Sequence, residues 1–173
     1  KDIDLLSDFF DIKEFEYHKK SDYIRLIGDV FHSDVTFSWF ALGYATATVL
    51  LSKILGKKSI VVAGGWDVEY IPEINYGAMR SSRHIRKACF ALKYADKVLA
   101  VSDSTKKSVF GWCKDANVET VYHGFEHVKY FPLPKTNLVV SVGSCSWQTL
   151  KVKGIETFVK SASYLPDVIF VLI

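Results

Sequence analysis

The sequence predicts an α/β protein built on a parallel sheet that is covered by helices. Short apolar runs alternate with longer helix-like segments along most of the 173 residues. The runs carry apolar residues on both faces, which is typical of strands buried inside a parallel sheet. The composition is that of a globular protein, with 49% hydrophobic and 24% charged residues. A chain of this length is about one domain and can bury a substantial core.

Six segments have the length and residue types of buried strands, and turn residues bound most of them. The clearest is the run 59–63, because it is rich in β-branched residues and ends at Gly64-Gly65. A loose alternation of apolar residues over 11–17 allows one more strand near the start of the chain. The predicted strands are residues 35–39, 59–63, 97–101, 118–122, 138–142 and 168–173.

Apolar residues at helical spacing predict helices between these strands. Gly56 stops one of them, and Ser102 or Asp103 caps another. The stretch 39–55 is the most apolar, but it is shorter than the roughly 20 residues of a membrane span, so we expect a buried helix. The predicted helices are residues 1–10, 21–31, 41–55, 82–95, 103–113 and 155–164.

Charge and cysteine content argue against several classes of function. The net charge is +3, and the basic residues are interrupted by acidic ones, so nucleic-acid binding is not expected. Cys89, Cys113 and Cys145 are an odd number at wide spacing, which fits neither a metal site nor a disulfide framework. Reduced thiols in a cytoplasmic protein are the simplest interpretation, and we expect no signal peptide at Lys1.

Both ends of the chain look interrupted. Residues 1–10 have the pattern of the tail of an amphipathic helix, and the apolar strand 168–173 has nothing after it that would cover it. We therefore expect this sequence to be a fragment of a longer protein.

The first candidate site is the stretch 143–154, between a predicted strand and a predicted helix. Ligands bind at the carboxyl ends of parallel strands, where Gly143 would let a phosphate approach the backbone. The helix that follows Gly154 would offer N–H donors, and Lys153 would add a positive charge. The spacing matches neither the P-loop nor the dinucleotide-binding fingerprint. The alternative is a solvent-exposed loop with an ordinary lysine.

The second candidate site is the turn Gly64-Gly65-Trp66-Asp67, which follows the predicted strand 59–63. Two glycines leave backbone N–H groups open at the carboxyl edge of the sheet. The Asp67 carboxylate would accept a hydrogen bond from a sugar hydroxyl or orient an acceptor. In the alternative interpretation this is a tight turn in which Trp66 packs and Asp67 caps.

A basic helix face is the third candidate. Arg80, Arg83, His84 and Lys87 lie at helical spacing and would face a phosphate or an anionic membrane surface. Such stripes are more often solvated helix faces. The polar run 102–105, at the start of the next helix, is explained by capping alone.

The segment 121–132 reads as a joint, because a turn glycine, aromatics and a proline follow a strand and precede a fresh one. Its residues His123-Gly124-Phe125-Glu126, followed by Tyr130 and Phe131-Pro132, resemble the interdomain segment of family-4 glycosyltransferases. That segment usually reads Asn-Gly-Val-Asp, with an aromatic residue and a proline a few positions later. The resemblance extends from about Ser59 to the end of the chain. Its further motifs are 98–102 with Lys106 and Lys107, 139–143, Lys153-Gly154-Ile155 and Leu165-Pro166-Asp167.

The resemblance implies the GT-B fold, in which two Rossmann-like domains, each a parallel sheet with helices on both faces, face a cleft. Residues 1–124 would form the acceptor-side domain without its first strand, 125–136 the linker, and 137–173 the first βαβ unit of the nucleotide-sugar-binding domain. The implied activity is retaining transfer of a sugar from a nucleotide-sugar donor to a glycan, a lipid or another acceptor. No cofactor and no metal is expected. The protein would be cytoplasmic, with peripheral contact to the inner face of the membrane.

The resemblance also assigns roles to individual residues. The donor diphosphate would be bound by Gly143, Ser144, Lys153 and Gly154. The acceptor side of the cleft would include Gly64, Gly65, Trp66 and Asp67, and the interdomain joint His123, Gly124 and Glu126. No catalytic residue is assigned.

This chain departs from the family pattern at several positions. Ser144 stands where an arginine is usual, His123 where an asparagine is usual, and Gly64 near the usual acceptor-side histidine. The loop 143–153 is also longer than usual. The family's glycine-rich loop near the N-terminus and its pair of donor-binding glutamates are not in this sequence, so the fragment is expected to be inactive alone.

Two other function classes fit the same pattern. A non-catalytic doubly wound module that binds a ligand or a partner would use the basic helix face as its contact surface. A sugar-nucleotide epimerase on the same fold would need catalytic carboxylates and histidines that the sequence does not point to.

Overall fold

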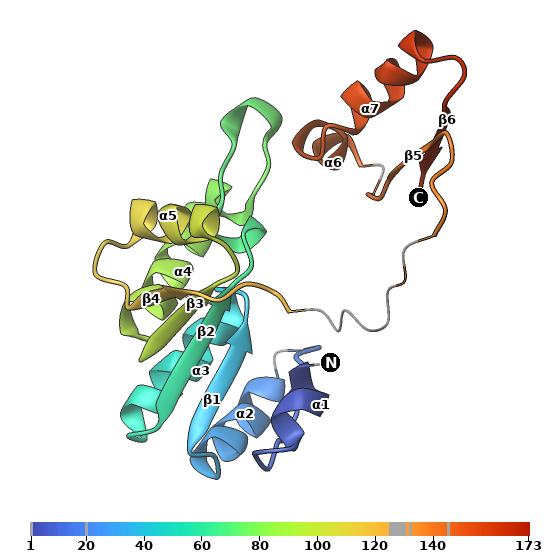
Figure 1. The fold of residues 1–173 in the computed structure, drawn as a ribbon. Helices are drawn as coiled ribbons and strands as arrows, with labels where there is room; N and C mark the ends of the chain where they lie inside the picture. Colours follow the sequence, from blue (N-terminus) through green and yellow to red (C-terminus); the bar gives the residue numbers. More distant parts are fainter. Residues whose placement is uncertain (1, 20, 125–130, 132, 145) are drawn as a thin grey trace. The chain divides into compact units, whose positions relative to one another are not determined.

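The structure is a computed structural model that describes residues 2–19, 21–124, 131, 133–144 and 146–173 (Figure 1). The chain divides into two compact units. The first contains Lys1–Tyr70 and Gly77–Tyr122, and the second contains Ile71–Tyr76 and His123–Ile173.

A four-stranded parallel sheet forms the centre of the first unit (Figure 1). Its strands follow one another in chain order, and Val61 lies opposite Ser38 on one side and Val98 on the other. The strands are β1 (Val35–Trp39), β2 (Lys58–Ala63), β3 (Lys97–Ala100) and β4 (Val118–Thr120). The predicted α/β class with a parallel sheet is therefore confirmed.

Helices connect the strands of this sheet. The crossovers contain α3 (Gly43–Ile54), α4 (Ser82–Tyr94) and α5 (Asp103–Trp112), close to the predicted segments. The short helices α1 (Asp2–Ser7) and α2 (Asp22–Phe31) precede β1. Three 3-10 turns lie between β2 and α4, namely η1 (Trp66–Val68), η2 (Pro72–Ile74) and η3 (Ala78–Arg80).

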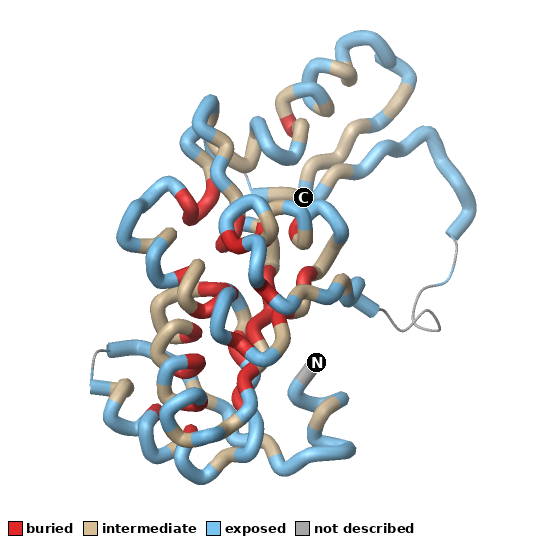
Figure 2. Tube along the Cα trace, turned by 90° about the vertical axis from the view of Figure 1, so that its left-hand side faces the viewer, coloured by how far each residue is buried: buried red, intermediate tan, exposed pale blue. Residues whose placement is uncertain are grey.

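The core lies between one face of the sheet and the three crossover helices. Val61 and Val98 are side by side on this face, where they share a buried cluster with Val49 of α3, Leu92 of α4 and Val109 of α5. The buried residues gather in the interior of the unit (Figure 2). One face receives all three helices because crossovers of one hand between strands in consecutive order put their helices on the same side.

The other face of the sheet is less covered. Val35 is 51% exposed and Phe37 is 42% exposed on the edge strand β1. Ile60 and Leu99, which share that face, are half-buried. The described crossover helices therefore cover one face of the sheet. The expectation that helices also cover the other face remains a prediction.

The second unit contains a smaller parallel strand pair. Its strands are β5 (Leu138–Ser141) and β6 (Ile169–Leu172), with α6 (Trp147–Val152), α7 (Ile155–Ser161) and η5 (Ala162–Tyr164) between them. Ile155 is fully buried, and the ring of Phe158 lies 5.2 Å from that of Phe170. The helix α7 therefore packs on the strand pair through Ile155 and Phe158, whereas Val159 is exposed.

Two local predictions differ from the structure. Residues 11–17 form no strand, and Lys13 and Phe15 contact α2 instead, through Asp29 and the Arg25 guanidinium respectively. The stretch 143–153 is not one long loop, because it contains α6. The Ser146 hydroxyl caps this helix by accepting a hydrogen bond from the Thr149 N–H group at 3.2 Å.

None of the helices among the described residues has the length and apolar character needed to cross a membrane. The most apolar helix, α3, has 12 residues and packs in the core of the first unit.

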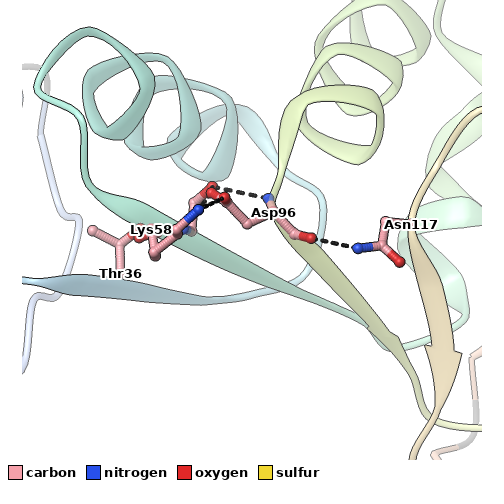
Figure 3. Close-up of polar contacts among 5 residues, drawn as sticks. Thr36, Lys58, Asp96 and Asn117 are labelled. Atoms are coloured by element: carbon pink, nitrogen blue, oxygen red, sulfur yellow. Dashed lines mark hydrogen bonds and ion pairs between the residues drawn. The ribbon is translucent and has the colours of Figure 1, made fainter.

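A polar network ties the amino ends of three strands together (Figure 3). Asp96, just before β3, accepts hydrogen bonds from the Lys58 ammonium at 2.8 Å and from the Ser59 N–H group at 3.0 Å. Its main-chain oxygen accepts one from the Asn117 side-chain amide at 2.7 Å. One residue therefore holds β2, β3 and the residue before β4 in register.

Replacing Asp96 by alanine should lower the free energy of unfolding at pH 7 by about 1 kcal/mol. The change leaves the buried Ser59 N–H group without its acceptor, whereas solvent already screens the partly exposed ion pair. Urea unfolding measures this effect. Asp115→Ala is the matched control, because Asp115 is exposed and makes one ion pair, with Lys93 at 3.7 Å.

The same pair of variants tests how the free energy of unfolding depends on pH. The Lys58 ammonium, with the Ser59 N–H group, holds the pKa of Asp96 below its ordinary value. A lowered carboxylate pKa gives stability that is present above the unfolded pKa of about 3.9 and is lost as the pH falls through the folded pKa. Asp96→Ala should therefore lose less stability than the wild type between about pH 7 and about pH 3. An acid slope identical to that of the wild type would contradict this role of Asp96.

Candidate functional site

The carboxyl edge of the first sheet gathers the loops that follow its parallel strands. Phe40 follows β1, Gly64 and Gly65 follow β2, Ser102 lies between β3 and α5, and Tyr122 lies just beyond β4. Ligands of open α/β sheets bind at this edge. The predicted turn Gly64–Asp67 therefore lies at the carboxyl edge, and its last two residues, Trp66 and Asp67, lie in η1.

The Asp67 side chain fastens two strand ends together. Its carboxylate accepts a hydrogen bond from the Ala41 N–H group at 2.7 Å and another from the Gly64 N–H group at 3.0 Å. Asp67 is fully buried, and burial raises its pKa while the backbone N–H groups act in the opposite direction. The carboxylate is thus engaged within the fold, but it does not cap η1, because Asp67 lies inside this turn and η1 has no side-chain cap. Trp66 beside it is 46% exposed and does not pack as the alternative interpretation expected.

Phe40 has an unusual backbone conformation beside this carboxylate. Its φ is 64°, a left-handed value that costs a non-glycine residue about 1–3 kcal/mol. A Cβ added to Gly64 would lie 2.4 Å from the Phe40 ring. The missing side chain of Gly64 therefore makes room for this ring, and the Asp67 bond to Ala41 holds the backbone directly after Phe40.

The start of α5 lies along the same edge. The Ser102 hydroxyl accepts a hydrogen bond from the Thr105 N–H group at 3.1 Å, which confirms the predicted cap. The buried Thr105 hydroxyl lies 3.7 Å from where a Cβ at Gly65 would be. The glycine turn after β2 and the start of α5 are therefore neighbours.

Asp103 provides an exposed carboxylate at this edge. It accepts hydrogen bonds from the Thr120 hydroxyl at 2.7 Å and from the Tyr122 hydroxyl at 2.9 Å, and these bonds lower the pKa of Asp103. A carboxylate can accept hydrogen bonds from the hydroxyls of a polyol, and neighbouring hydroxyls can both donate to it and accept from it. From the sequence, Asp103 was expected only as a helix cap, and the strand-end residues Thr120 and Tyr122 carried no signal of this contact.

Of the four residues of the predicted basic face, Arg83, His84 and Lys87 lie on α4, whereas Arg80 is the last residue of η3 and precedes the helix. The His84 ring nitrogen Nε2 is 3.1 Å from the main-chain oxygen of Asp67, so this side chain faces the turn. Arg83 and Lys87 are exposed, and Arg86, which the predicted stripe omitted, joins them.

In the second unit, three of the predicted diphosphate residues come together at the start of α7. A Cβ added to Gly143 would lie 2.9 Å from Ile155 Cδ1, so the close approach at this glycine is made by the first residue of α7. Gly154 precedes that residue with a φ of 66°. Lys153 comes directly before it and is exposed. Ser144, also exposed, follows Gly143.

Lys153 and its neighbour Lys151 differ in whether an acidic side chain pairs with them. The Lys151 ammonium pairs with Glu156, and together with Lys160 it lowers the pKa of Glu156 to about 2. Among the described residues, Lys153 has no such acidic partner. Its positive charge, at the carboxyl end of α6 and just before α7, is therefore open to an anion.

The predicted joint is described only at its beginning. His123 and Gly124 are exposed, and Glu126 lies outside the described residues. Within the described part of the chain, no group of three or more histidine, cysteine, aspartate or glutamate side chains is placed to hold a metal ion.

Comparison with known proteins finds no matching family model and no matching curated protein.

The Asp67→Ala variant should lose about 2–4 kcal/mol of unfolding free energy, because it removes the acceptor of two backbone N–H groups at buried or half-buried residues. Urea unfolding followed by circular dichroism measures the loss. Glu73→Ala serves as the control, because Glu73 is an exposed carboxylate in the loop between β2 and α4. A loss below about 1 kcal/mol would show that the Asp67 bonds do not hold the edge together.

Proposed function

We propose that this chain is part of a retaining glycosyltransferase of family 4 with the GT-B fold. The observation that carries the proposal is the order of parts along the chain. A parallel sheet with a glycine turn at its carboxyl edge is followed by the joint motif and then by a second parallel strand pair. In this second unit Gly143, Lys153 and Gly154 surround the start of α7.

On the donor side, Lys153 would bind the diphosphate of a nucleotide sugar. As the sugar leaves, negative charge builds on the diphosphate, and a fixed cation stabilises that charge in the transition state. Lys153 suits this role because its ammonium has no acidic partner among the described residues. Backbone N–H groups near Gly154 and the exposed Ser144 hydroxyl would supply further donors.

On the acceptor side, the carboxyl edge of the first sheet would hold a glycan or a lipid-linked acceptor. Gly65, Trp66 and the Asp103–Tyr122 pair are the groups available there. Asp67 would act by holding the edge in shape, because its carboxylate is already bonded to backbone. Contact with the inner face of a membrane in the cytoplasm belongs to the same proposal.

The domains would be 1–124 and 137–173 with the linker 125–136, and 137–173 would open a second Rossmann-like domain. The less covered sheet face of β1 and β2 would be covered by helices in the full domain.

The test uses the full-length protein. A panel of nucleotide sugars identifies the donor by release of the nucleoside diphosphate, and Lys153→Ala should then reduce turnover about a hundredfold. Lys151→Ala is the control, since it removes a lysine of the same segment whose ammonium is already paired with Glu156. This control should retain activity within a few-fold of wild type.

Two results would contradict the proposal. Wild-type turnover in Lys153→Ala would remove the donor-binding role of this lysine. A full-length protein that binds no nucleotide sugar and releases no nucleoside diphosphate would instead support the non-catalytic binding module.

A further inference from the structure

The outer surface of α4 contains a hollow of about 390 Å³ that is lined by basic side chains. Its lining residues are Arg83, Arg86 and Lys87. They occupy positions i, i+3 and i+4, which places them on one side of the helix. All three residues are exposed. The hollow is therefore open to solvent and surrounded by positive charge.

Arg83 lies in the first turn of α4, where positive charge is least favourable, and Arg86 and Lys87 follow in the next turn. The helix begins at Ser82, no acidic residue lies in its first turn, and Ser81 provides no side-chain cap. The amino end of a helix carries a partial positive charge, and like charges at this spacing repel one another. By contrast, Lys93 in the last turn of α4 lies where the helix favours a cation, and it pairs with Asp115.

A second helix start adds to the positive charge at the hollow. The Lys87 ammonium lies 3.6 Å from where a Cβ would be on Gly43, the first residue of α3. This helix also lacks a side-chain cap and has no acidic residue in its first turn. The Thr46 hydroxyl donates a hydrogen bond to the Lys87 main-chain oxygen at 2.9 Å, which fixes this part of α4 against α3.

The acidic groups in the described part of the chain leave the hollow unneutralised. Over the described residues, Arg83, Arg86 and Lys87 form no ion pair with an aspartate or glutamate. The Asp67 carboxylate, which is bonded to Ala41 just before α3, is fully buried and occupied by backbone N–H groups. Water and salt screen these exposed charges, and a bound anion would relieve their repulsion further.

We propose that Arg83, Arg86 and Lys87 form a binding site for a phosphate group of a small ligand. Two guanidinium groups offer planar pairs of donors that match phosphate oxygens, and the lysine adds a mobile point charge. The concave shape favours a discrete phosphate or diphosphate over the flat surface of a membrane. This site lies wholly within the first unit and does not depend on the proposed transferase activity.

The test is a titration of the 173-residue chain with inorganic pyrophosphate, followed by NMR signals of the backbone amides and arginine side chains. Saturable shifts should centre on residues 83–87. Arg83→Gln should weaken binding about tenfold, because a charge-assisted hydrogen bond is lost. Lys107→Gln is the matched control, since Lys107 is an exposed cation in the first half of α5, and it should change affinity less than twofold.

A second arm distinguishes a small phosphate ligand from a lipid headgroup. Sedimentation with vesicles of zwitterionic phospholipid, with and without an anionic phospholipid, measures membrane binding by the same variants. Pyrophosphate binding that is lost in Arg83→Gln supports the proposal whether or not vesicles also bind. Shifts that do not saturate, equal effects in the two variants, or binding to anionic vesicles alone would overturn it. Circular dichroism and urea unfolding confirm that Arg83→Gln remains folded.

Discussion

The buried carboxylate of Asp67 is the interaction on which the carboxyl edge of the first sheet depends. Its two hydrogen bonds join the backbone just beyond β1 to the backbone just beyond β2. The turn that carries it is also bound from two helices, by His84 to the Asp67 main-chain oxygen and by the Trp112 indole N–H to the Val68 main-chain oxygen at 2.9 Å. The left-handed conformation of Phe40 is therefore held by contacts on several sides, which is the condition under which such strain persists.

The two edges of this sheet are stabilised by different kinds of interaction. At the amino edge, Asp96 works through a partly exposed ion pair and backbone bonds, so solvent and salt weaken part of its contribution. At the carboxyl edge, Asp67 is sealed from water, and its hydrogen bonds have no solvent competition. The carboxyl edge is thus rigid at its centre, while exposed groups such as Asp103 and Tyr122 remain available at its surface. A rigid support beneath exposed polar groups is the arrangement that a binding site requires.

The sequence was informative where local pattern decides structure. Buried β-branched runs predicted the strands, and Ser102 predicted the start of α5, because both signals lie within a few residues. The role of Asp67 stayed open because its partner Ala41 lies 26 positions away, and nothing in the sequence signals that Phe40 adopts a positive φ. The helix α6 was missed because Gly143 and Gly154 at its flanks suggested a loop, although Ser146 was a usable cap signal.

The lysines and arginines discussed above differ in whether a carboxylate pairs with them. Lys58, Lys97 and Lys151 pair with carboxylates, so their charges are used within the fold. The cations of the hollow on α4 and the exposed Lys153 instead have no acidic partner among the described residues. Arg83 lies in the first turn of α4, where a bound anion would offset an unfavourable charge, whereas Lys153 lies at the carboxyl end of α6 and just before α7. The lack of an acidic partner there is what points to both proposed anion sites, and because they lie in separate units, each proposal can be tested without the other.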